Sequence, residues 1–334
     1  MLHTVKPYMP PPSIPPHAVM QQAAEWFALL SSGNATDADR LRWQSWLAAA
    51  PAHQQAWSYV DAVSQDMAQL QKAVNQDVVS DKLIDAHQRI SQRRKLLSLA
   101  AFIGLGSISW AVWRHTGLQG KVTAWHADHH TATGTIHALT LPDASQVWLN
   151  TASAINIDYS AGLRRIELVQ GEVLIATAAD AVNRPFVVDT LHGRMQALGT
   201  RFSVRLLNEQ TRLTVFESAV RVHPAQASDS RLVQSGQQVH FNDQTILAAA
   251  SALPDGDSWA NGVLQAHRMT LAELVAELRR YYRGHIGLAD EIAHLRVVGS
   301  FRLDDVPRSL QVLETVLPVR VQQTLPWWIS IEAD

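Results

Sequence analysis

Residues 164–178 read RRIELVQGEVLIATA, and this stretch indicates how the central part of the chain, residues 120–250, folds. Apolar side chains alternate with polar ones, as at Ile166 and Leu168, a period of two that is typical of β-strands. Gly171 separates this run from a second one that includes Val173. The pattern therefore predicts two strands that pair across a tight turn.

Further strand-like segments lie on both sides of this stretch, between residues 120 and 250. Turn-forming residues such as Pro142-Asp143 and Ser235-Gly236 separate them. The segments read GTIHALTLPDASQVWLN, RPFVVDT, RMQALGTRFSVRLL, TRLTVFESAVRVHP and LVQSGQQVHF. Because their period is two rather than 3.6, we expect residues 120–250 to form an all-β domain.

Strands and helices alternate in the last part of the chain, residues 259–334. Thr270 and Glu273 have the spacing of a capping box, and Pro307 suits an early helical position. The order predicts β-α-β twice and hence a small α/β domain. The expected elements are a strand at 263–265, a helix at 271–282, strands at 285–288 and 295–303, a helix at 306–317, and strands at 319–323 and 327–331.

The amino-terminal part is expected to be a small all-α bundle over residues 17–75. Residues 1–16 contain six prolines and no apolar period, so we expect a disordered tail there. Apolar residues then recur at helical spacing in three segments. Thr36 and Asp39 resemble a capping box at the start of the second helix, and Pro51 suits the first turn of the third.

Four tryptophans lie close together in this bundle: Trp26, Trp43, Trp46 and Trp57. Short helices need large side chains to make a core, which accounts for such residues without any partner. Tryptophan is also enriched at the energetic centres of protein interfaces. We therefore predict that these four side chains serve the fold and a protein partner together.

The stretch LLSLAAFIGLGSISWAVW, residues 96–113, is long, apolar and uncharged. As a helix it would extend about 27 Å, enough for one bilayer crossing, although a buried helix of a soluble domain is the alternative. Arg93 and Arg94, in a linker over residues 76–95, precede it and also resemble a twin-arginine export signal. Their charge predicts a single-pass inner-membrane protein with a cytoplasmic amino terminus and periplasmic domains after Arg114.

The composition excludes several classes of function. A net charge of −2 over 334 residues, with a local basic cluster only directly before residue 96, argues against direct nucleic-acid binding, and the absence of cysteine excludes thiolate and zinc–cysteine sites. No cofactor-binding or hydrolase motif occurs, so we expect neither a cofactor nor an enzyme. His126, Asp128, His129 and His130 could form a surface metal site, but a solvated loop is favoured and no metal is predicted.

Several of these segments resemble the FecR family of sigma-factor regulators. They are AAEWFALLSSGNATDADRLRWQSWLAAAPAHQQAW, LPDASQVWLN, RRIELVQGEV, RPFVVDT, ALGTRFSV and SGQQV. The resemblance implies that the helical domain is an anti-sigma domain binding an extracytoplasmic-function sigma factor. It also implies that residues 259–334 are similar to the short signalling domain of secretins and TonB-dependent receptors. That domain would contact the periplasmic signalling domain of such a receptor, in control of iron–siderophore uptake.

Two turns depart from the pattern of the family. Asp143-Ala144-Ser145 and Glu217-Ser218-Ala219-Val220 each lack a glycine that the family places in the turn. Because glycine adopts positive φ angles at little cost, the geometry of these two turns is in question.

The resemblance also implies a cleavage site at Gly199-Thr200, in ALGTRFSV. Some members of the family are split at this bond when the threonine hydroxyl attacks the preceding carbonyl. A glycine at the start of a strand, where backbones approach closely, is the alternative explanation.

The sequence also indicates envelope proteases as partners, a further contact patch and an alternative function. Glycine and serine within residues 96–113 lower helix propensity, which favours attack by envelope proteases. Arg279, Arg280 and Arg283 with Tyr281 and Tyr282 form a basic aromatic patch at a helix end, either a solvated turn or part of the receptor contact. The alternative function is a structural envelope protein whose α/β domain docks on a secretin-type assembly.

Overall fold

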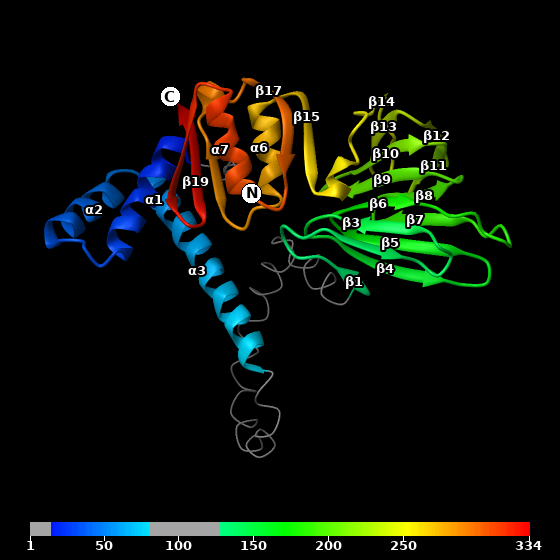
Figure 1. Cartoon of the computed structure of the whole chain (residues 1–334), viewed down its shortest axis with the longest axis horizontal. Coiled ribbons are helices and arrows are strands. Elements are labelled where there is room, and N and C mark those ends of the chain that lie inside the picture. Colours follow the sequence, from blue (N-terminus) through cyan, green and yellow to red (C-terminus); the bar gives the residue numbers. More distant parts are fainter. Residues whose placement is uncertain (1–14, 81–126) are drawn as a thin grey trace, which may run out of the picture.

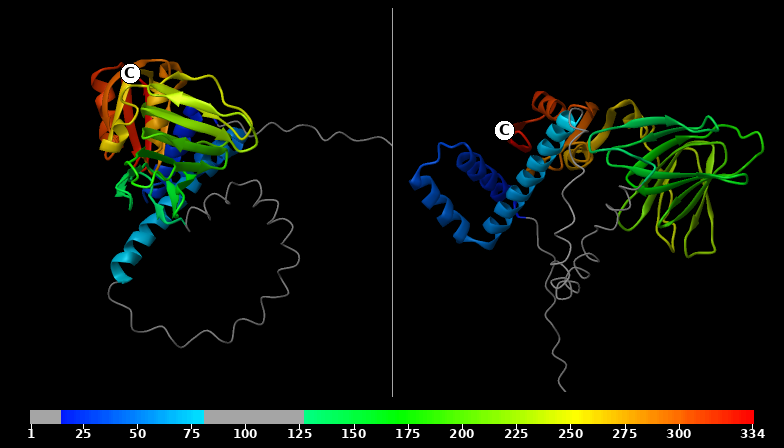
Figure 2. Two further views of the ribbon diagram at one scale, coloured as in Figure 1. Left: turned by 90° about the vertical axis from the view of Figure 1, so that its right-hand side faces the viewer. Right: turned by 90° about the horizontal axis from the view of Figure 1, so that it is seen from below.

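The computed structural model describes residues 15–80 and 127–334. They form a helical bundle at one end, a β-sandwich at the other and an α/β module between them (Figure 1; Figure 2). The bundle consists of α1 (His17–Ser31), α2 (Asp37–Ala49) and α3 (Pro51–Ser80).

The local sequence explains where the second helix begins. The backbone N–H of Thr36 donates to the Asp39 carboxylate at 2.9 Å, and the N–H of Asp39 donates to the Thr36 hydroxyl at 3.2 Å. These two bonds satisfy amide groups that have no partner within the helix. The capping box expected from the sequence is therefore confirmed, and α3 begins at Pro51 as predicted.

Two seven-stranded sheets make the sandwich, in the orders β1-β4-β5-β7-β8-β11-β12 and β14-β13-β10-β9-β6-β3-β2. All neighbouring strands are antiparallel except β5 and β7. The strands are β1 (His129–His130), β2 (His137–Thr140), β3 (Gln146–Leu149), β4 (Ala154–Tyr159), β5 (Arg164–Gln170), β6 (Glu172–Ala176), β7 (Phe186–Thr190), β8 (Gly193–Ala197), β9 (Arg201–Leu206), β10 (Thr211–Glu217), β11 (Ala219–Pro224), β12 (Arg231–Gln234), β13 (Gln237–Phe241) and β14 (Ala250–Ser251).

The two strands on either side of Gly171 do not pair with each other, so that part of the prediction is wrong. β5 pairs with β4 and β7 in one sheet, whereas β6 pairs with β3 and β9 in the other. Gly171 has a φ of +85°, and a Cβ there would come within 3 Å of Ser153. The chain thus passes from one sheet to the other at a residue where only glycine fits.

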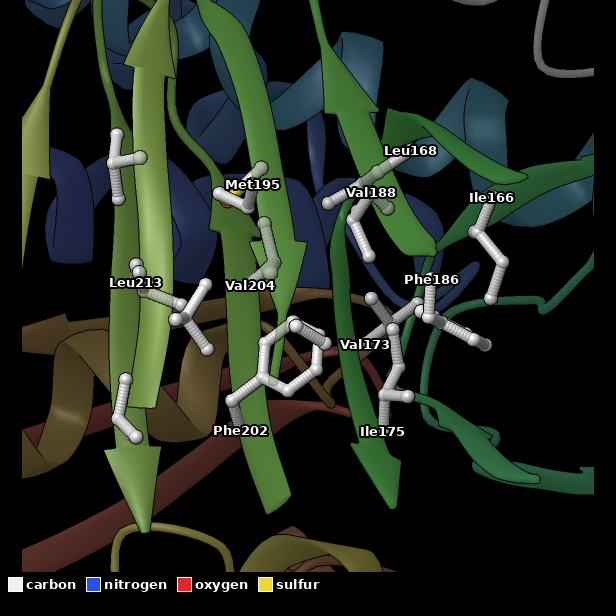
Figure 3. Close-up of a cluster of buried hydrophobic side chains, with 14 of the residues drawn as sticks. Ile166, Leu168, Val173, Ile175, Phe186, Val188, Met195, Phe202, Val204 and Leu213 are labelled. Carbon is white, nitrogen blue, oxygen red and sulfur yellow. The ribbon is translucent and has the colours of Figure 1, made fainter. Parts of the chain in front are cut away.

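Side chains from both sheets interdigitate to form the core of the sandwich (Figure 3). The alternation read from the sequence places every second residue of each strand inward. One sheet contributes Ile166, Leu168, Phe186, Val188 and Met195, and the other contributes Val173, Ile175, Phe202, Val204 and Leu213. All ten are at most 1% exposed, so this core can be dense without disulfides.

The α/β module contains a two-stranded and a three-stranded sheet. Its elements are β15 (Val263–Thr270), α6 (Leu271–Arg279), β16 (His285–Leu288), β17 (Arg296–Arg302), α7 (Val306–Gln311), β18 (Val319–Leu325) and β19 (Trp328–Ala333). β15 pairs with β17, and the other three strands follow the order β16-β19-β18. The order of elements matches the prediction, but the strands flanking each helix do not share a sheet, because the two β-α-β segments interleave.

The bundle and the module share a small core. Met20, Ala23 and Ala24 of α1 form one buried cluster with Ala56 and Val60 of α3 and with Trp328 of β19. This contact puts the two ends of the described chain side by side (Figure 1).

The predicted transmembrane topology is corrected by the structure. Across residues 15–80 and 127–334 no helix combines the length and the apolar character that crossing a bilayer requires; the longest, α3, is rich in glutamine and carries aspartates. The span expected over residues 96–113 lies outside the described residues, as do Arg93 and Arg94. The predicted fold class with one transmembrane helix, and the localisation as a single-pass inner-membrane protein, are contradicted. The structure shows a helical region followed by a large β-rich region.

Candidate functional site

Two of the four predicted tryptophans meet in the helical bundle. The ring centroids of Trp43 on α2 and Trp57 on α3 are 4.9 Å apart, and Phe27 on α1 lies 5.8 Å from Trp57. One aromatic cluster therefore links all three helices. All three side chains are half-buried rather than fully enclosed.

The other two tryptophans take different positions. Trp46 stacks on His53, with centroids 4.5 Å apart, and its indole N–H donates to Gln22 at 3.0 Å. His53 Nδ1 lies 2.6 Å from the Trp46 carbonyl oxygen, so this pair fixes the junction between α2 and α3. Trp26 is half-buried on α1. A role for the tryptophans was predicted from the sequence, whereas the contact of His53 with Trp46 was not.

The α2 helix has an unusual exposure for a helix with several apolar residues. It contains no fully buried residue, and Leu41 is 66% exposed. The indole N–H of Trp43 is covered and has no hydrogen-bond partner among the described residues. Leu41 precedes Trp43 by two residues and so lies on the side of α2 that is turned away from the aromatic cluster. We call this exposed side of the helix, centred on Leu41, the α2 face; it supplies uncovered apolar area of the kind that protein interfaces bury.

Gly199-Thr200 lies in a turn directly before β9. Gly199 has a φ of +78°, and the space beside its Cα is open. Thr200 is 3% exposed, yet its hydroxyl oxygen has no hydrogen-bond partner in the described structure. A buried hydroxyl without a partner carries a desolvation cost, which makes this residue exceptional in the sandwich.

Thr177, which follows β6, holds both backbone polar groups of Thr200. The Thr200 N–H donates to the Thr177 hydroxyl at 2.8 Å, and the Thr177 N–H donates to the Thr200 carbonyl oxygen at 3.0 Å. The Thr177 hydroxyl also lies 3.3 Å from that carbonyl oxygen, toward which it can donate. Nothing in the sequence pointed to Thr177, because the pairing of β6 with β9 alone brings it to Thr200.

Two members of the basic aromatic patch, Arg280 and Tyr281, do not belong to a solvated helix end. The guanidinium of Arg280 donates to Glu172 on β6 and to Glu277 on α6, at 2.7 and 2.8 Å. Tyr281 is 6% exposed, and its hydroxyl donates to the side chain of Asn150 at 2.7 Å. These contacts join the α/β module to the sandwich, so the position of the two residues is structural.

Charge compensation keeps the carboxylates of this junction ionised. Burial alone would raise the pKa of Glu172, but Arg280 and Arg212 outweigh that effect and hold the pKa below its usual value. Burial also opposes ionisation of Glu277, whereas Arg205 and Arg280 lower its pKa to about 2. We call these five residues the junction cluster. Removing either carboxylate would leave buried guanidinium groups without compensation.

His129 and His130 form the exposed strand β1, and His126 lies outside the described residues. Within the described ranges, no three histidine, aspartate or glutamate side chains are placed to share a metal ion.

Two protein-family models match the chain. The model described as FecR protein matches residues 127–221, which span the strands from β1 to β11. A model described as a domain of unknown function, DUF4880, which is the amino-terminal domain of FecR-type regulators, matches residues 21–63 in the helical bundle. The chain belongs to the FecR family. The two matches cover both the bundle and the sandwich, and hence both candidate sites.

Two crystal structures resemble the fold of this FecR-family chain. Both are of a Parabacteroides distasonis protein described as a candidate anti-sigma factor. Each is 20% identical and covers 62% of this chain and 98% of the solved chain, with TM-scores of 0.51 and 0.50. At this identity the likeness shows the fold. Among curated proteins, none matches the sequence.

Proposed function

We propose that this FecR-family chain is an anti-sigma regulator that binds an extracytoplasmic-function sigma factor through its helical bundle. The incompletely buried α2 face carries the proposal, because α2 contains apolar residues but no fully buried one. The family match to the bundle and the description of the Parabacteroides distasonis protein support the same assignment. Neither a metal nor a cofactor is needed for this activity.

The α/β module would receive the signal that controls this binding. We assign to the module contact with the signalling domain of a TonB-dependent receptor, in regulation of iron–siderophore uptake. Proteases would then release the bundle. The sequence resemblance of the module supports the assignment. So does its architecture, because β18 is an edge strand of its sheet, and an edge strand is where a partner strand can be added.

The α2 face gives a direct test of sigma-factor binding. Leu41→Glu places a charge on a side chain that is 66% exposed, so the bundle should still fold while an apolar interface is disrupted. We expect the affinity of the full chain for its proposed sigma-factor partner to fall about tenfold or more. Titration calorimetry measures this change.

The matched control is Gln69→Glu, which adds the same charge at an exposed polar position of α3, outside the α2 face. It should leave the affinity within about twofold, because truncating or altering most peripheral residues has little effect. Equal affinities for the wild type and Leu41→Glu would exclude the α2 face as the binding surface. Absence of any complex with the wild-type chain would exclude the function itself.

A second activity, self-cleavage at Gly199-Thr200, is favoured by the Thr200 hydroxyl, which is buried and has no partner. Such a hydroxyl is not engaged elsewhere and is free to attack the Gly199 carbonyl carbon. Mass spectrometry of freshly synthesised full chain should show a fragment that begins at Thr200. Thr200→Ala should abolish this fragment. An intact wild-type chain over hours would refute the proposal.

A further inference from the structure

Thr177 contacts an atom of the bond that self-cleavage would break. The nitrogen of the Gly199-Thr200 peptide bond is the backbone nitrogen of Thr200, and its N–H donates to the Thr177 hydroxyl at 2.8 Å. The Thr177 N–H holds the carbonyl oxygen of Thr200 at 3.0 Å. Thr200 is therefore fixed at both backbone groups, whereas its own hydroxyl is not restrained by any hydrogen bond in the described structure.

We propose that the Thr177 hydroxyl is a catalytic group for this cleavage and stabilises the nitrogen as it leaves; the inference rests on the self-cleavage proposed above. In the first step Thr200 Oγ1 forms a bond to the Gly199 carbonyl carbon, and the bond from that carbon to the Thr200 nitrogen breaks. The proton that Oγ1 loses goes to the nitrogen. The products are an ester between Gly199 and the Thr200 side chain and a free amine on Thr200.

Water completes the reaction. It adds to the ester carbonyl carbon, the bond to Oγ1 breaks, and Oγ1 regains a proton. Gly199 becomes a new carboxyl terminus and Thr200 a new amino terminus. No oxidant, reductant or metal is needed in either step.

The hydrogen bond from the Thr200 nitrogen to Thr177 should strengthen during the first step. An amide nitrogen is neutral, but it gains a proton and positive charge as the carbon–nitrogen bond breaks. Hydrogen bonds in which the donor is charged are shorter and about twice as strong as neutral ones. An interaction that is stronger in the transition state than in the starting chain accelerates the reaction.

The surroundings favour this geometry. Ala176 of β6 pairs with Arg201 of β9, so the ladder places Thr177 beside Thr200 without dependence on a flexible loop. The open space beside the Cα of Gly199 leaves room for its carbonyl carbon to become tetrahedral. The strand pair thus holds the leaving nitrogen while the preceding residue can rearrange.

Thr177→Val tests the proposal, because valine has nearly the shape of threonine but cannot accept the hydrogen bond. Loss of a hydrogen bond to a charged group corresponds to about a tenfold to hundredfold slower formation of the Thr200 fragment. Full-length chain made by cell-free translation, with the fragments followed by mass spectrometry, gives this rate. Thr177→Ser keeps the hydroxyl and should restore the rate to within about threefold of wild type.

A control variant separates this role from a general loss of packing. Thr214→Val removes another hydroxyl in the sandwich, one that donates to Gln238, and should leave cleavage unchanged. Hydroxylamine traps Gly199 of the ester as a hydroxamate, so a slower rise of hydroxamate in Thr177→Val places the effect in the first step. If the Thr177→Val variant does not fold, as shown by the lack of a cooperative unfolding transition, Thr177→Ala provides the same test.

The outcomes distinguish the two proposals. A wild-type chain that stays intact refutes self-cleavage itself. A wild type that is cleaved, together with a Thr177→Val variant cleaved at the same rate, refutes the role of Thr177 alone. Slow cleavage in both Thr177→Val and Thr177→Ser also overturns it, because the hydroxyl would then not be the group that matters.

Discussion

At the scale of single residues, two turns keep a backbone conformation that favours glycine although they lack it. Ala144 has a φ of +68° and Ser218 a φ of +59°. A side chain in this left-handed region costs roughly 1–2 kcal/mol. The two turns whose geometry was in question therefore retain positive φ angles, and the sandwich tolerates the strain.

Ala144→Gly should relieve this strain. Ala144 is exposed, so its methyl group contributes little packing that would be lost. We expect the free energy of unfolding to rise by about 0.5–1 kcal/mol, because the relief exceeds the entropy that glycine adds to the unfolded chain. Thermal unfolding followed by circular dichroism measures the change.

Ala181→Gly is the control at another exposed turn position, one without a positive φ. There glycine only increases the freedom of the unfolded chain, so stability should fall or stay constant. A stabilisation at Ala181 equal to that at Ala144 would show that the φ angle is not the cause.

At the scale of secondary-structure elements, β6 and α6 are held together by charges inside the protein. Glu172 is 4% exposed and lies 2.7 Å from Arg280 and 3.6 Å from Arg212. Asn150 and Ser203 also donate to its carboxylate. Because both carboxylate oxygens accept hydrogen bonds, the ion pairs can offset the cost of burying the charges.

Glu172→Gln keeps the size of the side chain but removes its charge. The positive charges of Arg280 and Arg212 are then no longer compensated, and the NH2 group of the new amide faces other hydrogen-bond donors. We expect the free energy of unfolding to fall by about 3 kcal/mol, as when one member of a buried ion pair is removed. Denaturant titration of the full chain tests this expectation.

Glu209→Gln makes the same chemical change at an exposed position and should alter stability by less than about 0.5 kcal/mol. A similarly small loss for Glu172→Gln would mean that the junction cluster contributes nothing to the union of β6 with α6.

The sequence predicted where most elements lie, because helix caps and apolar periods are local signals. The Thr270 hydroxyl accepts from the Glu273 N–H as the capping box requires, and α6 begins at the next residue. The sequence could not show which strands pair. Gly171 indicated a turn, but the steric contact with Ser153 that makes it a crossing between sheets exists only in the folded chain.

Local sequence patterns also could not predict sites that are formed by segments far apart in the chain. Arg280 looked like an exposed helix end because helix dipoles favour cations there, and its partner Glu172 is 108 positions away in the chain. Thr177 and Thr200 meet only through the pairing of β6 with β9. By contrast, the tryptophans of the bundle could be identified as candidate site residues from the sequence, because their number alone is unusual in so short a segment.

At the scale of the whole molecule, the packing of the bundle on the α/β module connects the two predicted binding regions. Gln21 on α1 is 6% exposed. Its amide nitrogen donates to the Thr324 hydroxyl at 2.9 Å, and its oxygen accepts from the Ser330 hydroxyl and from the Trp328 indole, the latter at 3.4 Å. One side chain thus satisfies polar groups on both β18 and β19.

Gln21→Ala should therefore weaken the contact between bundle and module while each keeps its fold. The change leaves the Ser330 hydroxyl and the Trp328 indole buried without a partner, which costs about 1–3 kcal/mol. Alanine also has a higher helix propensity than glutamine, so α1 itself is not destabilised. Amide hydrogen exchange should become faster at β18 and β19, whereas exchange in the sandwich stays constant.

Gln54→Ala, at an exposed position of α3, is the matched control and should leave exchange at β19 unchanged. If exchange in Gln21→Ala were equal to wild type, the hydrogen bonds of Gln21 would not hold the bundle to the module. If exchange becomes faster at β18 and β19 but not in the sandwich, a signal that reaches the module has a physical route to the bundle. A partner strand added at β18 would then change how α1 and α3 are held, and with them the α2 face that we propose for the sigma factor.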